Sequence, residues 1–319
     1  MASPRSLTES VMSRAFELGC DLAGVCSSSP PVSLGAYEEW IGKGMHGSMG
    51  YLARSIPLRE SPASLLPGVK TIVATGHNYF QHSVERPGFP KIARYALGRD
   101  YHKVLRKRLK PLAALISDLC PGSSSRICVD SAPILEREYA NRAGLGWFGK
   151  NTCIINSQRG SWFFIGLILT TATLAPTEPA IGGCGTCRAC IDACPTGAIV
   201  FESERWQVDS RKCVSALTIE HRGSFSDSQV PMIGEWTFGC DICQEVCPFN
   251  SHRESQPLRG RETTTQDFLQ HRDWPSLVHI ETLAQEEWDA ISAGSPVRRA
   301  GLEGFKRNAR ANRVNQGRV

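Results

Sequence analysis

The stretch "CGTCRACIDACPTGAI", from Cys184 to Ile199, places four cysteines within eleven positions, and a proline follows the last of them. A second run, "CDICQEVCP", extends from Cys240 to Pro248, and Cys213 lies between the two runs. In the spacing C-x2-C-x2-C-x3-C-P, three thiolates bind one 4Fe–4S cluster and the fourth binds a neighbouring cluster. The spacing therefore predicts two adjacent clusters.

The eight cysteines of this region divide into two sets of four. Because the last cysteine of each run crosses to the other cluster, the first set is Cys184, Cys187, Cys190 and Cys247. The second set is Cys194, Cys213, Cys240 and Cys243. No cysteine of the region is left over. A zinc ribbon also uses C-x2-C pairs and is the alternative, which the x2-x2-x3-Pro spacing disfavours.

Composition narrows the class of protein. The chain has 319 residues, enough for two domains and a small third, and its formal charge of +5 permits a polyanionic partner without requiring one. No apolar run reaches 18 residues and the N-terminus reads as an amphipathic helix, so we expect a cytoplasmic protein without a membrane span. The remaining cysteines adjoin apolar residues, and we interpret them as buried, inert thiols: Cys20, Cys26, Cys120, Cys128 and Cys153.

The chain before the cysteine runs reads as α/β. Strands are expected at 21–26, 70–79, 126–130, 153–156 and 162–171, and helices at 100–120 and 133–144. A mixed sheet covered by helices is the simplest architecture. Residues 173–183 are rich in Pro and Gly and are expected to form a linker. After Asn250 the sequence becomes polar, and its tail from Arg298 carries seven Lys/Arg and one Glu.

Several segments outside the cysteine runs resemble the epoxyqueuosine reductase family. They are "HGSMGYLARSIPLRESP" (46–62), "ARYALGRDYHKVLRKRLKPL" (93–112), "VDSAPILEREYANRAGLGWFGKNT" (129–152), "KCVSALTIEHRG" (212–223) and "SPVRRAGLEGFKRNA" (295–309). The resemblance implies a cobalamin-dependent iron–sulfur enzyme that reduces epoxyqueuosine to queuosine at the wobble position of tRNA. Some members of this family continue with further helical repeats, and this chain resembles a short form.

The resemblance also implies a domain organisation. Residues 1–175 are expected to form an α/β domain that binds cobalamin and carries the catalytic site. Residues 176–252 are expected to form a ferredoxin-like domain with two 4Fe–4S clusters, and residues 253–319 a short, basic, helical C-terminal segment.

Asp130 ends the predicted strand "RICVD" and matches the catalytic acid of the family. An epoxide oxygen leaves poorly as an alkoxide, so a nearby proton donor assists its departure. We predict that burial beside an apolar corrin raises the pKa of Asp130 enough for donation near neutral pH. The alternative is that Asp130 caps the helix that follows it.

Contacts to cobalamin are expected at Arg54, Lys150, Asn151, Ile154, Ser215 and Thr218. The glycines of "GLGWFGKN" would let the backbone approach a large flat ligand, although a helix end and a turn explain one of them equally well. Arg54 and its neighbour Arg59 also fit exposed structural roles or tRNA contacts. No D-x-H-x-x-G signature is present, so we expect base-off cobalamin and interpret the histidines as solvated or packing residues: His46, His77, His82 and His102.

The expected partners are a tRNA that carries epoxyqueuosine and an external low-potential electron donor of flavodoxin or ferredoxin type. Lys/Arg side chains would neutralise tRNA phosphates along 91–110 and along the tail, unless they form solvated helix faces. Aromatic side chains would stack on an extruded anticodon base, or belong to the core: Tyr95, Tyr101, Trp147 and Phe148. We expect a monomer.

Two other functions fit parts of the sequence. A reductive dehalogenase also combines cobalamin with two clusters but acts on a small organohalide. A ferredoxin-type electron carrier needs the clusters alone, although it has little use for the large N-terminal domain. The basic stretches and the "GLGWFGKNT" segment favour the tRNA enzyme.

Overall fold

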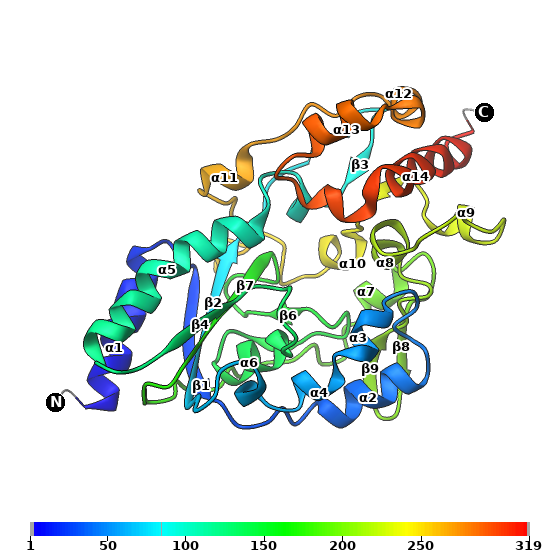
Figure 1. The fold of residues 1–319 in the computed structure, drawn as a ribbon. Helices are drawn as coiled ribbons and strands as arrows, with labels where there is room; N and C mark the ends of the chain where they lie inside the picture. Colours follow the sequence, from blue (N-terminus) through cyan, green and yellow to red (C-terminus); the bar gives the residue numbers. More distant parts are fainter. Residues whose placement is uncertain (1–2, 84, 318–319) are drawn as a thin grey trace.

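The computed structural model describes residues 3–83 and 85–317. Figure 1 shows a four-stranded sheet in the N-terminal part of the chain, in the order β1-β2-β7-β4, with every neighbouring pair antiparallel. The strands are Leu22–Ser27 (β1), Thr71–Asn78 (β2), Ser125–Cys128 (β4) and Phe163–Thr170 (β7). All four lie where the sequence predicts strands.

One face of this sheet packs against two helices, α1 (Pro4–Glu17) and α5 (Tyr101–Leu119). Successive side chains of a strand point to opposite faces, and Phe164 and Ile168 of β7 enter this core. α5 contributes a stripe with three- and four-residue spacing: Val104, Leu105, Leu109, Leu112 and Ile116. Asp100 caps α5, because its carboxylate accepts the backbone N–H of His102. The N-terminal end of α5 is thereby fixed.

The other face packs against α6 (Glu136–Arg142), which buries Tyr139 and Ala140 against Leu167 of β7. The sequence predicts this helix from residue 133, but it begins three residues later. The delay arises because residues 132–136 form tight turns, in which Ile134 N–H donates to Ala132 O and Glu136 N–H donates to Ile134 O. Asp130 lies between the end of β4 and these turns.

Each cysteine run contains one short helix, α7 (Ala189–Asp192) in the first and α10 (Ile242–Glu245) in the second, and these two helices pack together. Between them the chain forms a hairpin, two short helices and a strand: β8 (Ile199–Glu202), β9 (Arg205–Val208), α8 (Val214–Ile219), α9 (Gln229–Met232) and β10 (Trp236–Phe238). Ser203 and Glu204 both have positive φ, which a two-residue type I′ hairpin turn requires.

The segment between β1 and β2 lies against this hairpin. It contains α2 (Leu34–Gly42), α3 (Gly50–Arg54), α4 (Ile56–Arg59) and the 3-10 turn η1 (Pro62–Ser64). Trp40 Nε1 donates to Val208 O at 2.8 Å, and Ser210 N–H donates to Met45 O at 2.8 Å. Figure 1 shows α2 and α3 beside β8 and β9, so this segment of the N-terminal part packs against the cysteine region.

The C-terminal segment packs onto both preceding parts. It contains α11 (Gln266–Leu269), α12 (Leu277–Thr282), α13 (Gln285–Ser292), η3 (Pro296–Ala300) and α14 (Gly301–Asn315). Trp274, Trp288 and Phe305 form an aromatic core with Phe238 of β10. β10 pairs in parallel with β3 (Lys91–Ile92), which precedes the 3-10 turn η2 (Arg94–Ala96). The chain thus contains parallel as well as antiparallel pairing.

Two expectations on connecting segments need refinement. Residues 173–183 have no regular secondary structure, but Thr177 is anchored because its hydroxyl donates to Ala143 O and accepts Val25 N–H, both at 2.9 Å. The basic tail is a packed helix, in which Asn308 and Asn312 are fully buried; Arg318 lies outside the described residues. None of the helices within 3–83 and 85–317 combines the length and the apolarity that a membrane span needs.

Candidate active site and cluster sites

The first set of cysteines surrounds one small cavity. Cys184, Cys187, Cys190 and Cys247 all line it, together with Ala189, Pro248 and Phe249. Burial, together with the nearby thiols of Cys184, Cys247 and Cys187, raises the pKa of Cys190 to about 11. Four soft ligands around one space, drawn from both cysteine runs, are the donor set that a 4Fe–4S cluster takes.

The second set is also brought together. Burial raises the pKa of Cys240 to about 12, with added effects from the thiols of Cys213 and Cys194. Cys213 occupies the N-cap position of α8. Burial raises the pKa of its thiol, and the nearby backbone N–H groups of Ala216 and Ser215 act in the opposite direction.

Cys153 is a ninth cysteine beside the two sets. Burial raises its pKa to about 11; Arg137 lowers the pKa, whereas Cys247, Cys190 and Cys213 raise it. Because these three thiols belong to different sets, Cys153 lies between the two. From the sequence, Cys153 was interpreted as one of five buried, inert thiols. Three other members of that group, Cys20, Cys26 and Cys128, are indeed buried, because each is at most 5% exposed.

The segment "GLGWFGKNT" connects both sets to the sheet domain. It forms the hairpin of β5 (Trp147–Phe148) and β6 (Ile154–Ile155). Lys150 Nζ donates to Gly185 O at 2.8 Å and to Cys187 O at 2.9 Å, and Asn151 Nδ2 donates to Cys243 O at 3.3 Å. Lys150 and Asn151 therefore hold the loops that carry the cysteines.

The glycines of this segment serve close packing within the protein. A Cβ at Gly146 would lie 2.3 Å from Ile155 O, and one at Gly144 would lie 2.3 Å from Glu178 O. A Cβ at Gly149 would meet Ile155 Cδ1 at 2.5 Å. Gly144 and Gly146 thus allow close packing within the protein, whereas Gly149 also lines a cavity, and the expectation that these glycines admit a flat ligand stays a prediction.

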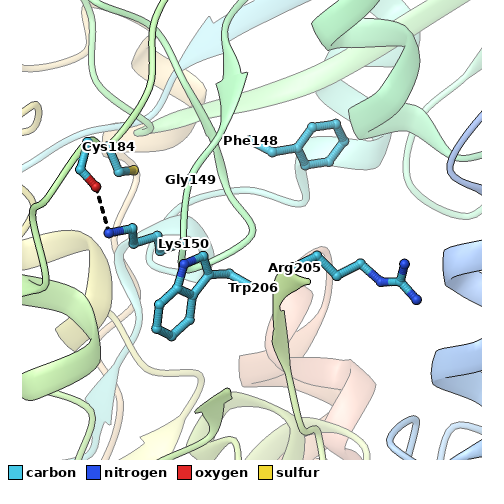
Figure 2. Close-up of a pocket in the computed structure, with 7 residues that line it drawn as sticks. Phe148, Gly149, Lys150, Cys184, Arg205 and Trp206 are labelled. Carbon is cyan, nitrogen blue, oxygen red and sulfur yellow. Dashed lines mark hydrogen bonds between the residues drawn. The ribbon is translucent and has the colours of Figure 1, made fainter. Parts of the chain in front are cut away.

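A cavity of about 280 Å³ opens beside the first set of cysteines. Figure 2 shows Phe148, Lys150, Arg205 and Trp206 around it, with Cys184 at one side. Phe148 is 45% exposed, and Lys150 Nζ lies 5.5 Å from the centre of the Trp206 ring. Aromatic walls and cationic groups suit a flat, polar aromatic group of a ligand.

Asp130 forms a polar cluster with the start of α5. Its Oδ2 accepts hydrogen bonds from Tyr101 Oη at 2.9 Å and from His102 Nε2 at 3.0 Å, while His102 Nδ1 lies 2.7 Å from Asp100 Oδ1. Burial lowers the pKa of His102, but the carboxylates of Asp100 and Asp130 outweigh it and set the pKa at about 9. His102 is therefore an imidazolium at neutral pH.

The electrostatics of Asp130 bear on one prediction. Burial pushes its pKa upward, but hydrogen bonds and charge from His102, with smaller effects of Tyr101 and Arg299, leave the pKa below its usual range. The polypeptide alone therefore does not raise the pKa of Asp130, and the rise predicted for burial beside a corrin stays a prediction. Asp130 is also no helix cap, because α6 begins at Glu136 with Leu135 before it.

Glu136 has the raised pKa that the sequence assigns to Asp130. Burial and the charge of Asp130 bring the pKa of Glu136 to about 8. The Asp130 side chain keeps 61% of its surface exposed although burial acts strongly on its pKa. The carboxyl therefore faces solvent.

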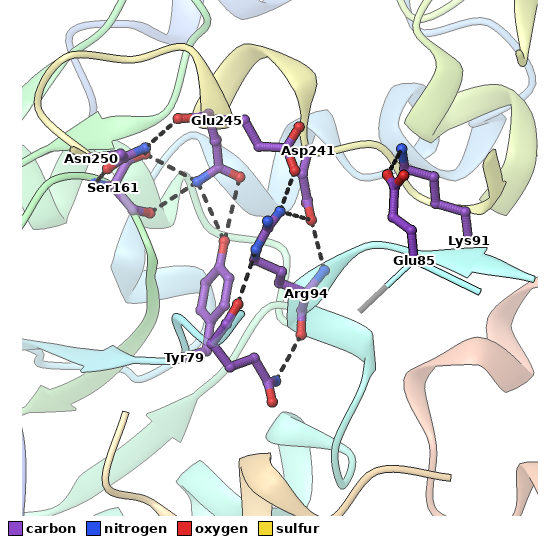
Figure 3. Close-up of polar contacts among 10 residues, drawn as sticks. Tyr79, Glu85, Lys91, Arg94, Ser161, Asp241, Glu245 and Asn250 are labelled. Carbon is purple, nitrogen blue, oxygen red and sulfur yellow. Dashed lines mark hydrogen bonds and ion pairs between the residues drawn. The ribbon is translucent and has the colours of Figure 1, made fainter. Parts of the chain in front are cut away.

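Tyr95 is an electrostatic link between Asp130 and the loop of the second set of cysteines. Burial raises the pKa of Tyr95, and the charges of Asp130 and Asp241 add to this effect. Asp241 directly follows Cys240 in the sequence. Figure 3 shows how this loop is held: Arg94 forms an ion pair with Asp241 at 3.1 Å and another with Glu245. Both the acid and the loop of the second set therefore act electrostatically on Tyr95.

The residues predicted to bind cobalamin divide into two groups. Ile154 and Thr218 are buried, and the Thr218 hydroxyl donates to Val214 O and accepts Gly239 N–H, so contacts through these side chains are excluded. Arg54 is exposed and Ser215 is half-buried. Arg59 is structural, because it donates to Ile134 O and lies over the Tyr37 ring.

Three of the four aromatic residues predicted to stack on a base already have ring partners. Tyr101 stacks on Phe164 at 4.2 Å, Trp147 packs against Phe249, and Tyr95 contacts Phe238. Among the histidines, His77 is buried, whereas His102 belongs to the acid cluster. The interpretation of His102 as a packing residue is wrong, and the sequence "DYH" at the start of α5 is the signal that identifies it.

Two family models match the chain. The model "4Fe-4S double cluster binding domain" matches residues 183–250, and the model "Epoxyqueuosine reductase QueG, DUF1730" matches residues 59–131. The first match covers all eight cysteines of the two sets and supports 4Fe–4S binding by this region.

Known proteins match nearly the whole chain. The epoxyqueuosine reductase of Escherichia coli strain K12 is 38% identical over 310 residues, which cover 95% of this chain and 79% of that protein. A crystal structure of epoxyqueuosine reductase with an epoxyqueuosine-modified tRNA-Tyr stem loop has a TM-score of 0.85 and 25% identity, over 98% of this chain and 82% of that one.

A second solved structure concerns the acid loop. The epoxyqueuosine reductase of Bacillus subtilis, solved with its catalytic aspartate loop swung out of the active site, has a TM-score of 0.86 at 25% identity, over 99% of this chain and 83% of that one. From the identity to the curated relative and the extent of both chains that it covers, this chain belongs to the epoxyqueuosine reductase family.

Proposed function

We propose that this protein reduces epoxyqueuosine to queuosine at the wobble position of tRNA. The reaction takes the epoxide, two electrons and two protons and yields an alkene and water. The relatives carry the name of this activity, and one of them has been solved with the modified stem loop. The single observation in this chain that carries the proposal is Asp130, which is exposed to solvent and accepts hydrogen bonds from Tyr101 and His102.

The two sets of cysteines would hold two 4Fe–4S clusters. Cys184, Cys187, Cys190 and Cys247 would bind the first cluster, and Cys194, Cys213, Cys240 and Cys243 the second. Bound clusters would pass electrons one at a time toward the acid site. Lys150 and Asn151 would position both cysteine loops from the same hairpin.

Base-off cobalamin would bind on the solvent-exposed side of Asp130. When bound, it supplies a cobalt centre that delivers electrons to the substrate. The half-buried Ser215 and the exposed Arg54 remain available to it. Phe148, Lys150 and Trp206 would hold the flat base of its nucleotide tail in the cavity that they line.

Proton delivery would depend on Asp130 and His102. His102 holds a proton on Nε2 at neutral pH and donates it to Asp130 Oδ2 at 3.0 Å. A proton that moves along this hydrogen bond would make Asp130 the acid that protonates the leaving oxygen. Asp100, on the far side of the imidazole, favours the protonated ring and fixes its orientation.

The exposed face of α5 is a better candidate than the basic tail for binding tRNA phosphates. Lys103, Arg106, Lys107 and Lys110 are exposed on it, and Arg106 Nη2 donates to Ser131 Oγ beside the acid. In the tail, Arg298 pairs with Asp289 and Arg299 with Glu220, which reduces their availability. Phosphate contacts on α5 would bring the anticodon to the acid cluster.

The remaining expectations complete the proposal. Residues 1–175 would form the catalytic domain, 176–252 the two-cluster domain and 253–319 the C-terminal segment, although the last packs on both others. We propose a cytoplasmic monomer that receives electrons from a flavodoxin- or ferredoxin-type donor.

Anaerobic reconstitution with iron, sulfide and cobalamin, followed by an assay on epoxyqueuosine-containing tRNA, tests the function. Formation of queuosine, detected by nucleoside mass spectrometry, supports the proposal. Turnover of an aryl halide without turnover of tRNA would instead identify a dehalogenase. Failure to bind any corrinoid while the clusters assemble would identify an electron carrier.

A further inference from the structure

The loop that carries Asp130 has an unusual backbone. Asp130 has a φ of 55°, in the left-handed region that residues other than glycine rarely adopt. The flanking residues close a three-residue turn, because Ser131 N–H donates to Val129 O at 2.6 Å. A γ-turn with positive φ at its central residue is rare and strained, so it persists only where surrounding groups hold it.

Glu136 provides such a hold. Its Oε1 accepts the backbone N–H of Asp130 at 2.6 Å, across the six residues that separate them. Glu136 begins α6, which is fixed to the sheet by Tyr139 and Ala140, both fully buried. The acceptor is therefore attached to a rigid element, whereas the donor belongs to a strained turn.

We propose that Glu136 is the positioning residue of the catalytic loop: its carboxyl holds the Asp130 turn in the conformation that presents the Asp130 carboxyl to Tyr101 and His102. This role deepens the proposed function, and its relevance to catalysis rests on that function. The hold itself is a property of the polypeptide. The Bacillus subtilis relative, solved with its catalytic aspartate loop swung out, supports a loop that needs such a hold.

The charge state of Glu136 suits this role. Burial and the charge of Asp130 bring the pKa of Glu136 to about 8, while His102 and Arg59 act in the opposite direction. At neutral pH a largely neutral carboxyl accepts the N–H without placing a second negative charge beside Asp130. A glutamine has the same length and an oxygen acceptor, so it should replace Glu136 in the hold.

Arg106 provides a second, weaker connection from α5. Its Nη2 donates to Ser131 Oγ at 2.7 Å, and this side chain is exposed. A substitution of Glu136 leaves this contact in place. Faster exchange of the loop in a Glu136 variant therefore results from loss of the Glu136 carboxyl and not from loss of the contact with α5.

Amide hydrogen exchange read by mass spectrometry, on the full-length cluster-loaded protein, tests the hold directly. We expect exchange in peptides that contain the Asp130 amide to be faster by about tenfold or more in Glu136→Ala and in Glu136→Asp, whose shorter side chain loses the contact. Glu136→Gln should exchange like the wild type. Glu286→Gln is the matched control, because Glu286 is an exposed acid in the first turn of α13.

The same variants connect the hold to catalysis. With tRNA as substrate, we expect Glu136→Ala and Glu136→Asp to lower kcat by about tenfold or more while KM stays within about threefold, because the loop presents the acid and not the phosphate contacts. Glu136→Gln should retain most of the activity. If Glu136→Ala fails to fold, the comparison of Asp with Gln at this position decides the question.

Two results would overturn the proposal: unchanged exchange in the Ala and Asp variants, or a Gln variant that exchanges as fast as the Ala variant. Faster exchange with unchanged kcat would also overturn the positioning role. Exchange requires no substrate, so a wild-type protein without activity on epoxyqueuosine would defeat the proposed function and still leave the hold to be decided by exchange.

Discussion

His102 Nε2 lies 3.0 Å from Asp130 Oδ2, and the same imidazole contacts Asp100 through Nδ1 at 2.7 Å. One cation thus joins two carboxylates, which raises the pKa of His102 to about 9 and lowers that of Asp130. The proton that the reaction needs at neutral pH is therefore held on the imidazole, one hydrogen bond away from the acid that would deliver it.

Replacement of His102 by Gln should lower kcat by about tenfold to a hundredfold, because the proton held beside Asp130 is lost. In the wild type, the rate should decline as pH rises through about 9, where the imidazolium loses its proton. The variant should lack this alkaline limb. A pH–rate profile of both proteins measures it, and His82→Gln, at an exposed histidine, should leave the profile unchanged.

Replacement of Asp130 by Asn should abolish proton delivery while it preserves the fold. We expect queuosine formation to fall by about a hundredfold or more, the range of a lost general acid. Iron content should equal that of the wild type, because Asp130 contacts no cysteine of either set in the described structure. Near-normal queuosine in the nucleoside digest would show that Asp130 is not the acid.

The cysteine spacing predicts the two sets from sequence alone, and the structure gathers the first of them around one cavity. The strands and the amphipathic helix at 100–120 were likewise predictable from their periodicity. The protonation states of Asp130, His102 and Glu136 were not predictable from the sequence. They depend on contacts such as the one between Tyr101 and Asp130, 29 residues apart, which no local pattern encodes.

The roles of small and polar side chains were also poorly predicted. Gly146 and Thr218 are compatible with ligand contact by residue type, yet their neighbours in space are Ile155 and Gly239. Glu136 has no sequence signal beyond its place in the first turn of a helix, where acids are common. Its importance appears only when the Asp130 turn is seen in three dimensions.

Stability should decrease as pH rises from about 6.5 to about 9. His102 has a raised pKa, so its stabilising charge is fully present below the unfolded value and is lost through about 9. Glu136 also has a raised pKa, so the folded state binds a proton that the unfolded state releases, which lowers stability toward pH 8. Thermal unfolding midpoints at several pH values should show this trend, reduced in Glu136→Gln and His102→Gln; a midpoint that rises with pH would contradict both assignments.

Iron analysis of cysteine variants should distinguish the predicted cluster ligands from the neighbouring Cys153. Cys190→Ser should lower the iron content of anaerobically reconstituted protein by about half, because one of two four-iron clusters loses a thiolate. Cys153→Ser should keep nearly all of the iron, since the two sets are complete without it. Equal losses in the two variants would place Cys153 among the ligands and require a new assignment.

The ion pair of Arg94 with Asp241 connects the sheet domain to the loop of the second set. The side chains of Arg94 and Asp241 are 12% and 3% exposed, and Asp241 also accepts the Arg94 backbone N–H at 2.8 Å. Arg94→Met would leave Asp241 buried beside Cys240 without its cation. Loss of one partner of a buried pair costs about 3–5 kcal/mol, so we expect a large fall in the free energy of unfolding.

An exposed ion pair provides the control for this prediction. Arg86 and Asp273 are paired at 3.3 Å with side chains that are 55% and 91% exposed, so Arg86→Met should cost no more than about 1 kcal/mol. Chemical unfolding of both variants under anaerobic conditions gives the comparison. If Arg94→Met is no less stable than Arg86→Met, the buried pair does not hold the cysteine loop against the sheet domain, and the contact between Tyr79 and Gln244 remains to connect the two parts.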